Sequence, residues 1–173
     1  MTRLPLLLSG AALLLCAAGA VAMQKLPWQK SGANNGQPPQ SVAYLYPEQI
    51  TLTAGKQGSV EMHFRVKDGL HINSHTPREK SFIPTQLIVA EPSGVKVSSV
   101  DFPSGSDYSP AFSPSDKLSV YTGEFVVTAH ITATPGEHLL EGALRYQACD
   151  TNSCYPPREA PVALDIIADQ VRR

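Results

Sequence analysis

The sequence predicts an all-β domain. Proline accounts for 15 of the 173 residues and glycine for another 12, which disfavours long helices and favours short elements joined by turns. Apolar and polar side chains alternate over residues 60–66, as in a strand with one buried face. No window shows apolar residues at helical spacing, so crossover helices are not expected.

The strand signals recur from Val42 onward. The clearest strand, 60–66, ends at the turn dipeptide Asp68-Gly69. Turn residues also separate the later segments, as at 91–94 and 134–137. About seven to nine short strands without helices predict antiparallel sheets packed face to face, an immunoglobulin-like β-sandwich. The further strands are expected at 50–53, 70–73, 85–90, 95–102, 119–133, 139–148 and 162–167.

One long segment, 103–116, has no strand pattern. It reads PSGSDYSPAFSPSD, with Tyr108 and Phe112 as its only large apolar residues. Loops of this length in compact domains are more often functional than idle. The segment is therefore a candidate for part of a site.

The N-terminus has the pattern of an export signal. Arg3 supplies a positive charge, residues 4–21 are mainly apolar, and Ala20-Val21-Ala22 offers small residues for cleavage. The alternatives are a membrane anchor and, at Cys16, a lipidation site. Pro5, with glycines further along, disfavours the anchor, and the bulky Leu15 disfavours lipidation.

Four segments follow from this pattern. Residues 1–22 are expected to be a signal peptide and 23–40, rich in Gln, Asn, Gly and Pro, a flexible leader. Residues 41–168 form the predicted sandwich and 169–173 a tail. No second apolar stretch of membrane-spanning length follows the signal, so the mature chain is expected to be periplasmic or otherwise exported, with no membrane span.

The charge of the chain is nearly balanced. Fourteen Lys and Arg residues face 15 Asp and Glu, and no cluster of cations stands out. A nucleic-acid-binding or acidic-membrane surface is therefore not predicted.

Two cysteines remain after the signal, Cys149 and Cys154. In an oxidising compartment they are expected to form a disulfide, because each is the other's only intramolecular partner. Polar turn residues 150–153 lie between them. Closing so small a ring contributes only about 2 kcal/mol to stability, so the bond is an inefficient staple. A structural clip and a redox-active disulfide both fit this pattern.

The stretch 146–157, YQACDTNSCYPP, resembles the active-site signature of the N-terminal periplasmic domain of the DsbD family of thiol-disulfide interchange proteins. FRVKDGLHIN at 64–73 and DKLSVYTGEF at 116–125 are similar to neighbouring strands of that domain. The resemblance covers about 41–168. It implies an immunoglobulin-like sandwich whose cysteine pair takes electrons from a thioredoxin-like domain and passes them to thioredoxin-fold proteins.

The resemblance also implies roles for single residues. Cys154 matches the cysteine that forms mixed disulfides with partners, and Cys149 the one that resolves them. Tyr108 or Phe112 falls where the family has an aromatic cap over the disulfide. Two tyrosines, Tyr146 and Tyr155, flank the signature and are candidates near the site.

The chain departs from the family pattern at several points. Four residues separate the cysteines instead of five, and His71 and Asn73 stand where the family has an aromatic pair beside the site. His71 is expected either to lower a thiolate pKa when protonated or to be an exposed strand histidine without a role. The membrane core and C-terminal thioredoxin-like domain have no counterpart here, so the chain resembles a single module.

The sequence thus predicts a protein-disulfide reductase module in which sulfur carries the electrons and no bound cofactor is needed. The electron donor is expected to be a thioredoxin-like protein or a membrane reductase on another chain. The alternative is an immunoglobulin-like binding or scaffold domain whose disulfide fixes a loop. No metal site is expected from His63, His71 and His75, and no hydrolase motif is evident.

Overall fold

The computed structural model describes residues 41–45, 49–110 and 115–170, whose regular elements are all strands. The predicted signal peptide, 1–22, and leader, 23–40, lie outside the described residues, as does Phe112. The strands are β1 (Val42–Leu45), β2 (Gln49–Thr53), β3 (Gln57–Val66), β4 (His71–Asn73), β5 (Gln86–Ala90), β6 (Val95–Asp101), β7 (Ser106–Tyr108), β8 (Leu118–Tyr121), β9 (Glu124–Ala133), β10 (Gly136–Tyr146), β11 (Ala148–Cys149) and β12 (Arg158–Asp169).

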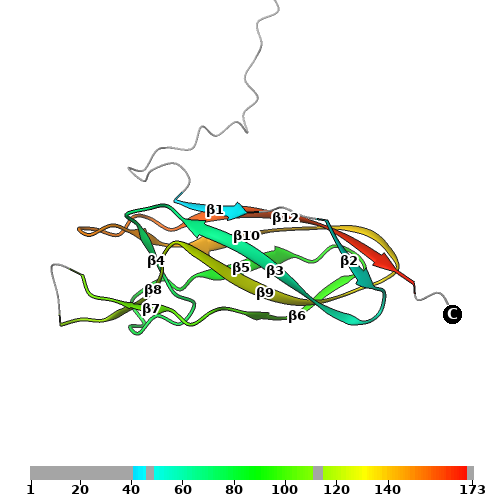
Figure 1. Cartoon of the computed structure of the whole chain (residues 1–173), viewed down its shortest axis with the longest axis horizontal. Coiled ribbons are helices and arrows are strands. Elements are labelled where there is room, and N and C mark those ends of the chain that lie inside the picture. The colour runs from blue at the N-terminus through cyan, green and yellow to red at the C-terminus, as the bar shows by residue number, and fades with distance from the viewer. Residues whose placement is uncertain (1–40, 46–48, 111–114, 171–173) are drawn as a thin grey trace, which may run out of the picture. The chain divides into compact units, whose positions relative to one another are not determined.

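The strands form three four-stranded sheets. Sheet A has the order β1-β3-β9-β6, sheet B the order β2-β12-β10-β5, and sheet C the order β11-β4-β8-β7. Sheet C is made of short strands, and Figure 1 shows β4, β7 and β8 together at the left end of the long strands. The hairpin between β10 and β12, drawn in orange, reaches the same end.

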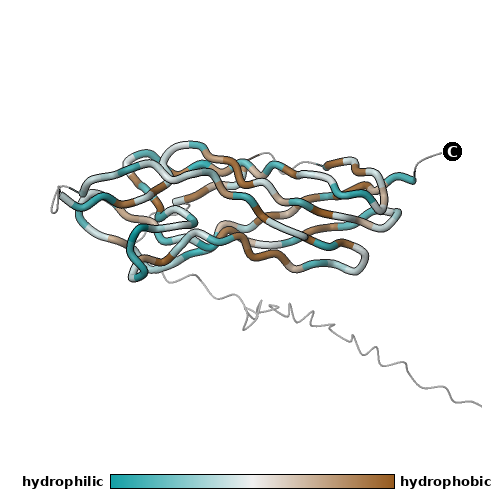
Figure 2. Tube along the Cα trace, turned by 90° about the horizontal axis from the view of Figure 1, so that it is seen from below, coloured by the Kyte–Doolittle hydropathy of each residue, from teal (hydrophilic) through white to brown (hydrophobic). Residues whose placement is uncertain are grey.

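Sheets A and B enclose the core. Alternate residues of β3 and β9 are buried, as are alternate residues of β12, so each strand turns one face inward. Figure 2 shows this as alternating brown and pale or teal segments along the tube. Phe64 and Met62 of sheet A join Leu140 and Leu144 of sheet B in one buried cluster. The predicted all-β sandwich is confirmed.

The structure corrects one strand boundary that bears on the site. The expected single strand 119–133 is two strands, β8 and β9, separated by Thr122 and Gly123. Gly123 has a φ of 59°, a conformation that other residues rarely adopt, and it lets the chain leave sheet C and enter sheet A. The expected strand 139–148 is likewise divided at Gln147 into β10 and β11.

Two pairings differ from the expected pattern. Residues 106–108 of the segment without strand pattern form β7, which pairs with β8. The sequence Ser-Asp-Tyr shows no apolar alternation because β7 is an edge strand of sheet C. The strand could therefore not be recognised from the pattern. The sandwich also contains one parallel pair, because β2 joins the side of β12 in parallel. The other strand pairs described are antiparallel, as predicted.

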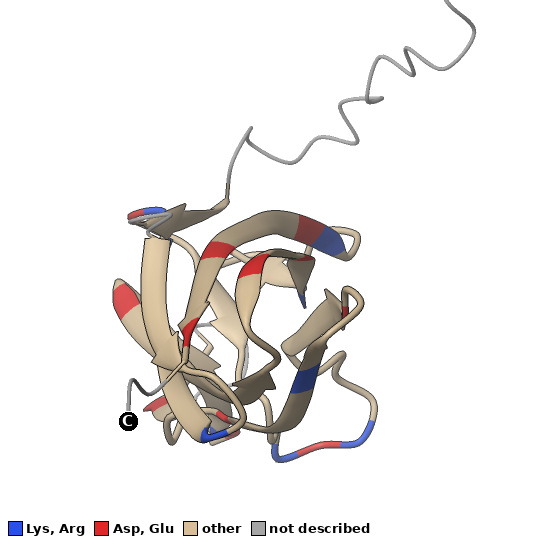
Figure 3. Cartoon of the chain, turned by 90° about the vertical axis from the view of Figure 1, so that its right-hand side faces the viewer, with Lys and Arg blue, Asp and Glu red and all other residues tan. Residues whose placement is uncertain are grey.

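The charged residues are spread over the described part of the chain. Figure 3 shows Lys, Arg, Asp and Glu as scattered segments on strands and loops. Between residues 41 and 170, leaving out the undescribed gaps, no helix has the length and apolar character needed to cross a membrane.

Candidate functional site

The two cysteines lie at the end of a long hairpin. β10 and β12 pair from Gly136↔Ala168 to Tyr146↔Arg158, and the chain between them forms β11 and a tight turn. Cys149 and Cys154 face each other as an antiparallel bridge and form a disulfide, with their Cα atoms 4.0 Å apart. The Tyr155 N–H donates to the Ala148 carbonyl at 2.8 Å, which continues the hairpin from the β10–β12 ladder to the disulfide.

The two cysteines differ in their exposure to solvent. Cys149 is 1% exposed, because β11 is covered by its neighbours, whereas Cys154 is an exposed residue. Disulfide exchange needs in-line approach of a thiolate to one sulfur. Of the two cysteines, Cys154 is therefore the one exposed to an approaching thiolate.

Asp150 organises the turn between the cysteines. Its Oδ1 accepts hydrogen bonds from the backbone N–H of Asn152 at 2.7 Å and of Ser153 at 2.8 Å, and its Oδ2 accepts one from the Tyr155 hydroxyl at 2.5 Å. The Tyr155 bond is the largest cause that lowers the pKa of Asp150, followed by the two backbone bonds. The turn thus holds a carboxylate beside the disulfide.

His71 lies directly opposite Cys149. The two residues are partners in the pairing of β4 with β11, and His71 is only 4% exposed. Its ring contacts that of Tyr108, with centroids 4.1 Å apart. Burial lowers the pKa of His71, and the Asp150 carboxylate partly offsets this effect. The expectation of an exposed strand histidine was wrong, because β7 and β11 cover it.

A pocket of about 280 Å³ opens beside the disulfide. Its apolar lining includes Tyr108 and Phe82, and its remaining lining includes both cysteines and polar residues of the turn. The lining residues are His71, Phe82, Tyr108, Pro110, Asp116, Leu118, Cys149, Asp150, Asn152, Ser153 and Cys154. Tyr108 therefore lies at the disulfide pocket, and the other predicted cap residue, Phe112, lies outside the described residues.

The remaining predicted residues take different positions. Asn73 is buried behind the turn, where its Nδ2 donates to the Ile83 carbonyl at 3.0 Å and to Oε1 of Gln147 at 3.3 Å. Gln147 in turn donates to the carbonyl of Tyr155 at 3.2 Å. Asn73 therefore supports the turn through Gln147.

Tyr146 lies away from the disulfide pocket. It is 2% exposed and belongs to the main core cluster. Burial raises the pKa of its phenol, and hydrogen bonding to the Val42 backbone and the Ser41 side chain opposes this. Of the two flanking tyrosines, only Tyr155 contacts the turn.

Sequence reasoning missed two contributors to the site, Asp150 and Gln147. The role of Asp150 could have been predicted, because Asp in a turn commonly accepts hydrogen bonds from the N–H groups of residues two and three positions later. Gln147 had none, because its role depends on Asn73 of a distant strand.

The histidines do not form a metal site in the described ranges, where no group of three His, Cys, Asp or Glu side chains is placed to hold an ion. His75 stacks on Phe102 with centroids 4.2 Å apart, and its Nδ1 lies 2.9 Å from the Thr85 carbonyl. It is thereby held in a separate contact from His71.

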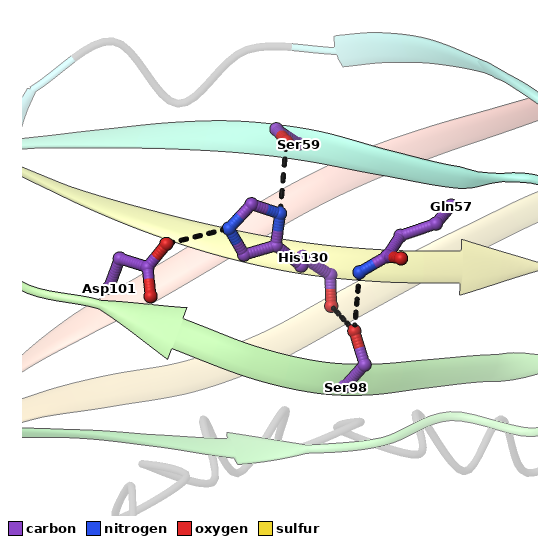
Figure 4. Close-up of polar contacts among 5 residues, drawn as sticks. All are labelled: Gln57, Ser59, Ser98, Asp101 and His130. Atoms are coloured by element: carbon purple, nitrogen blue, oxygen red, sulfur yellow. Dashed lines mark hydrogen bonds and ion pairs between the residues drawn. The ribbon is translucent and has the colours of Figure 1, made fainter.

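A second histidine network crosses sheet A (Figure 4). His130 Nδ1 lies 3.0 Å from Ser59 Oγ, and Nε2 lies 2.7 Å from Asp101 Oδ2. The residue types are those of a hydrolytic triad. Ser59 and His130 are paired on β3 and β9, the two inner strands of sheet A, whose backbone N–H groups serve the sheet rather than an oxyanion.

This network supports a β-bulge. The pairing of β6 with β9 shifts between Val97 and Ser99. Ser98, at the shift, donates its hydroxyl to the His130 carbonyl at 3.0 Å and accepts from Gln57 Nε2 at 2.9 Å. The side chains therefore replace ladder contacts that the bulge disturbs.

No family model and no curated protein matches the chain. The solved structures that are similar to it include three N-terminal domain structures of the DsbD and ScsB proteins. The reduced DsbD N-terminal domain of Neisseria meningitidis is 20% identical, with 78% of this chain and 93% of that chain covered and a TM-score of 0.47. The N-terminal periplasmic domain of ScsB from Proteus mirabilis is 15% identical, with 72% and 44% covered and a TM-score of 0.49.

The third structure is the complex between the DsbD N-terminal and PilB N-terminal domains of Neisseria meningitidis. Its match is 18% identical, with 76% of this chain and 88% of that chain covered and a TM-score of 0.44. The chain is thus structurally similar to DsbD and ScsB N-terminal domains over most of its length, at low sequence identity.

Proposed function

We propose that the chain is an exported thiol-disulfide exchange module that reduces disulfides of thioredoxin-fold partner proteins. The observation that carries this proposal is the unequal exposure of the two cysteines, because Cys154 is an exposed residue and Cys149 is buried. A structural disulfide does not need one exposed and one buried cysteine. In thiol-disulfide exchange, one cysteine forms the mixed disulfide with the partner and the other resolves it.

The reaction balances in two steps. In the reduced chain, the Cys154 thiolate attacks a partner disulfide, so that a mixed disulfide forms and one partner thiolate leaves. Cys149 then attacks the Cys154 sulfur, the bond to the partner breaks, and the second partner thiolate leaves. The partner gains two electrons and the chain ends as the Cys149–Cys154 disulfide.

Reduction of the Cys149–Cys154 disulfide by an electron donor follows the same steps in reverse. A donor thiolate attacks Cys154 of the oxidised chain and releases Cys149, and a second donor thiol then frees Cys154. The donor in this proposal is a thioredoxin-like protein or a membrane reductase on another chain. Sulfur carries both electrons, so no cofactor takes part.

The pocket beside Cys154 supports this function. Its apolar wall, which includes Tyr108 and Phe82, gives a partner a surface next to the accessible sulfur. Tyr108 also shields the disulfide from small thiols in this proposal, until a partner displaces the ring.

The proposal is tested by trapping. With a thioredoxin-fold partner in its disulfide form, reduced Cys149→Ser should accumulate a mixed disulfide through Cys154, and reduced Cys154→Ser should accumulate none. Equal trapping by both variants would contradict the assigned order. The reduction potential of the wild-type pair should also lie above about −300 mV, the range below which structural disulfides are found.

The alternative makes the opposite prediction. In an immunoglobulin-like binding domain, the hydrogen bonds of Asp150 would hold the turn for recognition and the disulfide would clip it. A potential below about −300 mV, together with slow reaction of both sulfurs, would establish the clip.

A further inference from the structure

The burial of Cys149 screens this residue from bulk water. Cys149 is 1% exposed, and a buried position solvates a thiolate poorly. The thiolate is the nucleophile in exchange, so a buried resolving thiol needs a neighbouring base. The same group must return a proton when Cys149 is the leaving sulfur.

His71 is placed to serve this thiol. Directly paired residues of antiparallel strands bring their Cβ atoms within about 4.5–5.5 Å, on the same face, and His71 is the strand partner of Cys149. Both side chains line the disulfide pocket. His71 therefore neighbours the resolving sulfur on a rigid element.

The ring nitrogens of His71 are also available to accept or donate a proton. His71 is 4% exposed, and no hydrogen bond joins either ring nitrogen to another of the described residues. Its contact is the Tyr108 ring, 4.1 Å away between centroids. Buried polar atoms are nearly always hydrogen-bonded, so an unpaired one calls for a function.

The charges around His71 suit a transient imidazolium. Asp150 is the charged group that acts on it, and its carboxylate is fixed by the turn. Because burial lowers the pKa of His71, the ring is neutral at rest and ready to accept a proton. The titratable groups that share its two pockets are Lys67, Asp68, Tyr108, Asp116, Asp150 and the two cysteines when reduced.

We propose that His71 is the acid-base group of Cys149: it takes the thiol proton when Cys149 attacks the mixed disulfide and returns it when Cys149 leaves. This inference rests on the proposed exchange function. In the forward step the S–H bond breaks, the proton moves to a His71 nitrogen, the Cys149–Cys154 bond forms and the partner sulfur departs as thiolate. Asp150 stabilises the resulting imidazolium.

The test separates attack from resolution. Reduced protein is mixed with 5,5′-dithiobis(2-nitrobenzoate) in a stopped-flow instrument. Attack by Cys154 releases one coloured thiolate, and resolution by Cys149 releases the second. His71→Phe keeps an aromatic ring against Tyr108 but removes the base. It should slow the second phase at least about tenfold near pH 7, with a much smaller effect on the first.

His75→Phe is the matched control, because it makes the same substitution in a histidine that also stacks on an aromatic ring, outside the disulfide pocket. Both of its phases should match the wild type. The rate of the second phase in the wild type should also decrease at acid pH, as His71 becomes protonated. His71→Phe should not show this decrease.

A measurement on the wild type guards against misfolding of the variant. The His71 ring, followed by NMR from acid to neutral pH, should titrate differently in the oxidised and reduced forms. Identical titration, or an unchanged second phase in a folded His71→Phe variant, would overturn the role of His71. A wild type without a second phase would instead contradict the exchange function itself.

Discussion

His71 and His130 show how position decides what the same side chain does. Each lies on a strand with an aspartate nearby. His130 occupies the outer face of sheet A and has both ring nitrogens engaged, by Ser59 and Asp101. His71 is buried in sheet C opposite Cys149, and no described residue hydrogen-bonds to its ring.

The difference teaches that residue types alone do not identify a site. The Ser59–His130–Asp101 network contains the groups of a hydrolytic triad, yet its hydrogen bonds connect three strands across a bulge. The disulfide pocket combines a buried cysteine, an exposed cysteine and a histidine whose ring accepts or donates no hydrogen bond among the described residues. The four predictions below compare these two regions.

The largest effect is expected from removing the accessible sulfur. Cys154→Ser should reduce exchange to the uncatalysed background, because the remaining Cys149 is buried. Ser59→Ala should leave exchange unchanged, since it affects only the network on sheet A. The rate of reduction of a thioredoxin-fold partner disulfide measures both. Loss of exchange in Ser59→Ala would show that the two regions are coupled.

The next effect is on stability. His130→Ala removes the side-chain contacts to Ser59 and Asp101 and should lower the free energy of unfolding by about 1–2 kcal/mol. The reduction potential of the disulfide should not change. Urea unfolding and a glutathione redox titration provide the two measurements. A shifted potential would contradict the structural role assigned to His130.

A third prediction concerns pH. Burial lowers the pKa of His71 below its ordinary value of 6.5, so the unfolded chain binds its proton more readily. The contribution of neutral His71 to stability is therefore present above about pH 6.5 and is lost as the pH falls toward its folded pKa. His71→Phe should lose less stability than the wild type between about pH 7.5 and about pH 5.5. Urea midpoints at both pH values test this, and equal losses would argue against a buried neutral His71.

The smallest effect is expected from Asp150→Asn. The side-chain oxygen can still accept the backbone hydrogen bonds, but the charge that raises the pKa of His71 disappears. The pKa of His71 should fall modestly, and NMR titration measures the shift. The same substitution at Asp101, which contacts His130 instead, is the control and should leave the titration of His71 unchanged.

The sequence was sufficient to predict the strands that alternate in polarity and to locate the cysteine turn. It did not predict β7, because Ser106 and Asp107 are polar and the strand lies at a sheet edge. It also joined β8 to β9, because no local pattern distinguishes Gly123 in an αL turn from a glycine within a strand.

Within the site, the sequence located the cysteines and indicated His71 and Tyr108 as neighbours, but it did not predict which of these residues are buried. Whether His71 is buried depends on β7 and β11, which approach β4 from distant parts of the chain. The unequal exposure of Cys149 and Cys154 arises in the same way. Such properties come from tertiary packing, which local pattern does not encode.

The register of β10 with β12 has a consequence for the redox cycle. The two strands pair up to Tyr146↔Arg158, and backbone hydrogen bonds continue to Tyr155, so the hairpin holds the cysteines face to face independently of the bond between them. Each thiol therefore presents a high effective molarity to the other in the reduced chain. The lifetime of a mixed disulfide is then limited by proton removal from Cys149 rather than by the time that Cys149 needs to reach Cys154. This arrangement favours rapid release of the partner protein over its retention as a mixed disulfide.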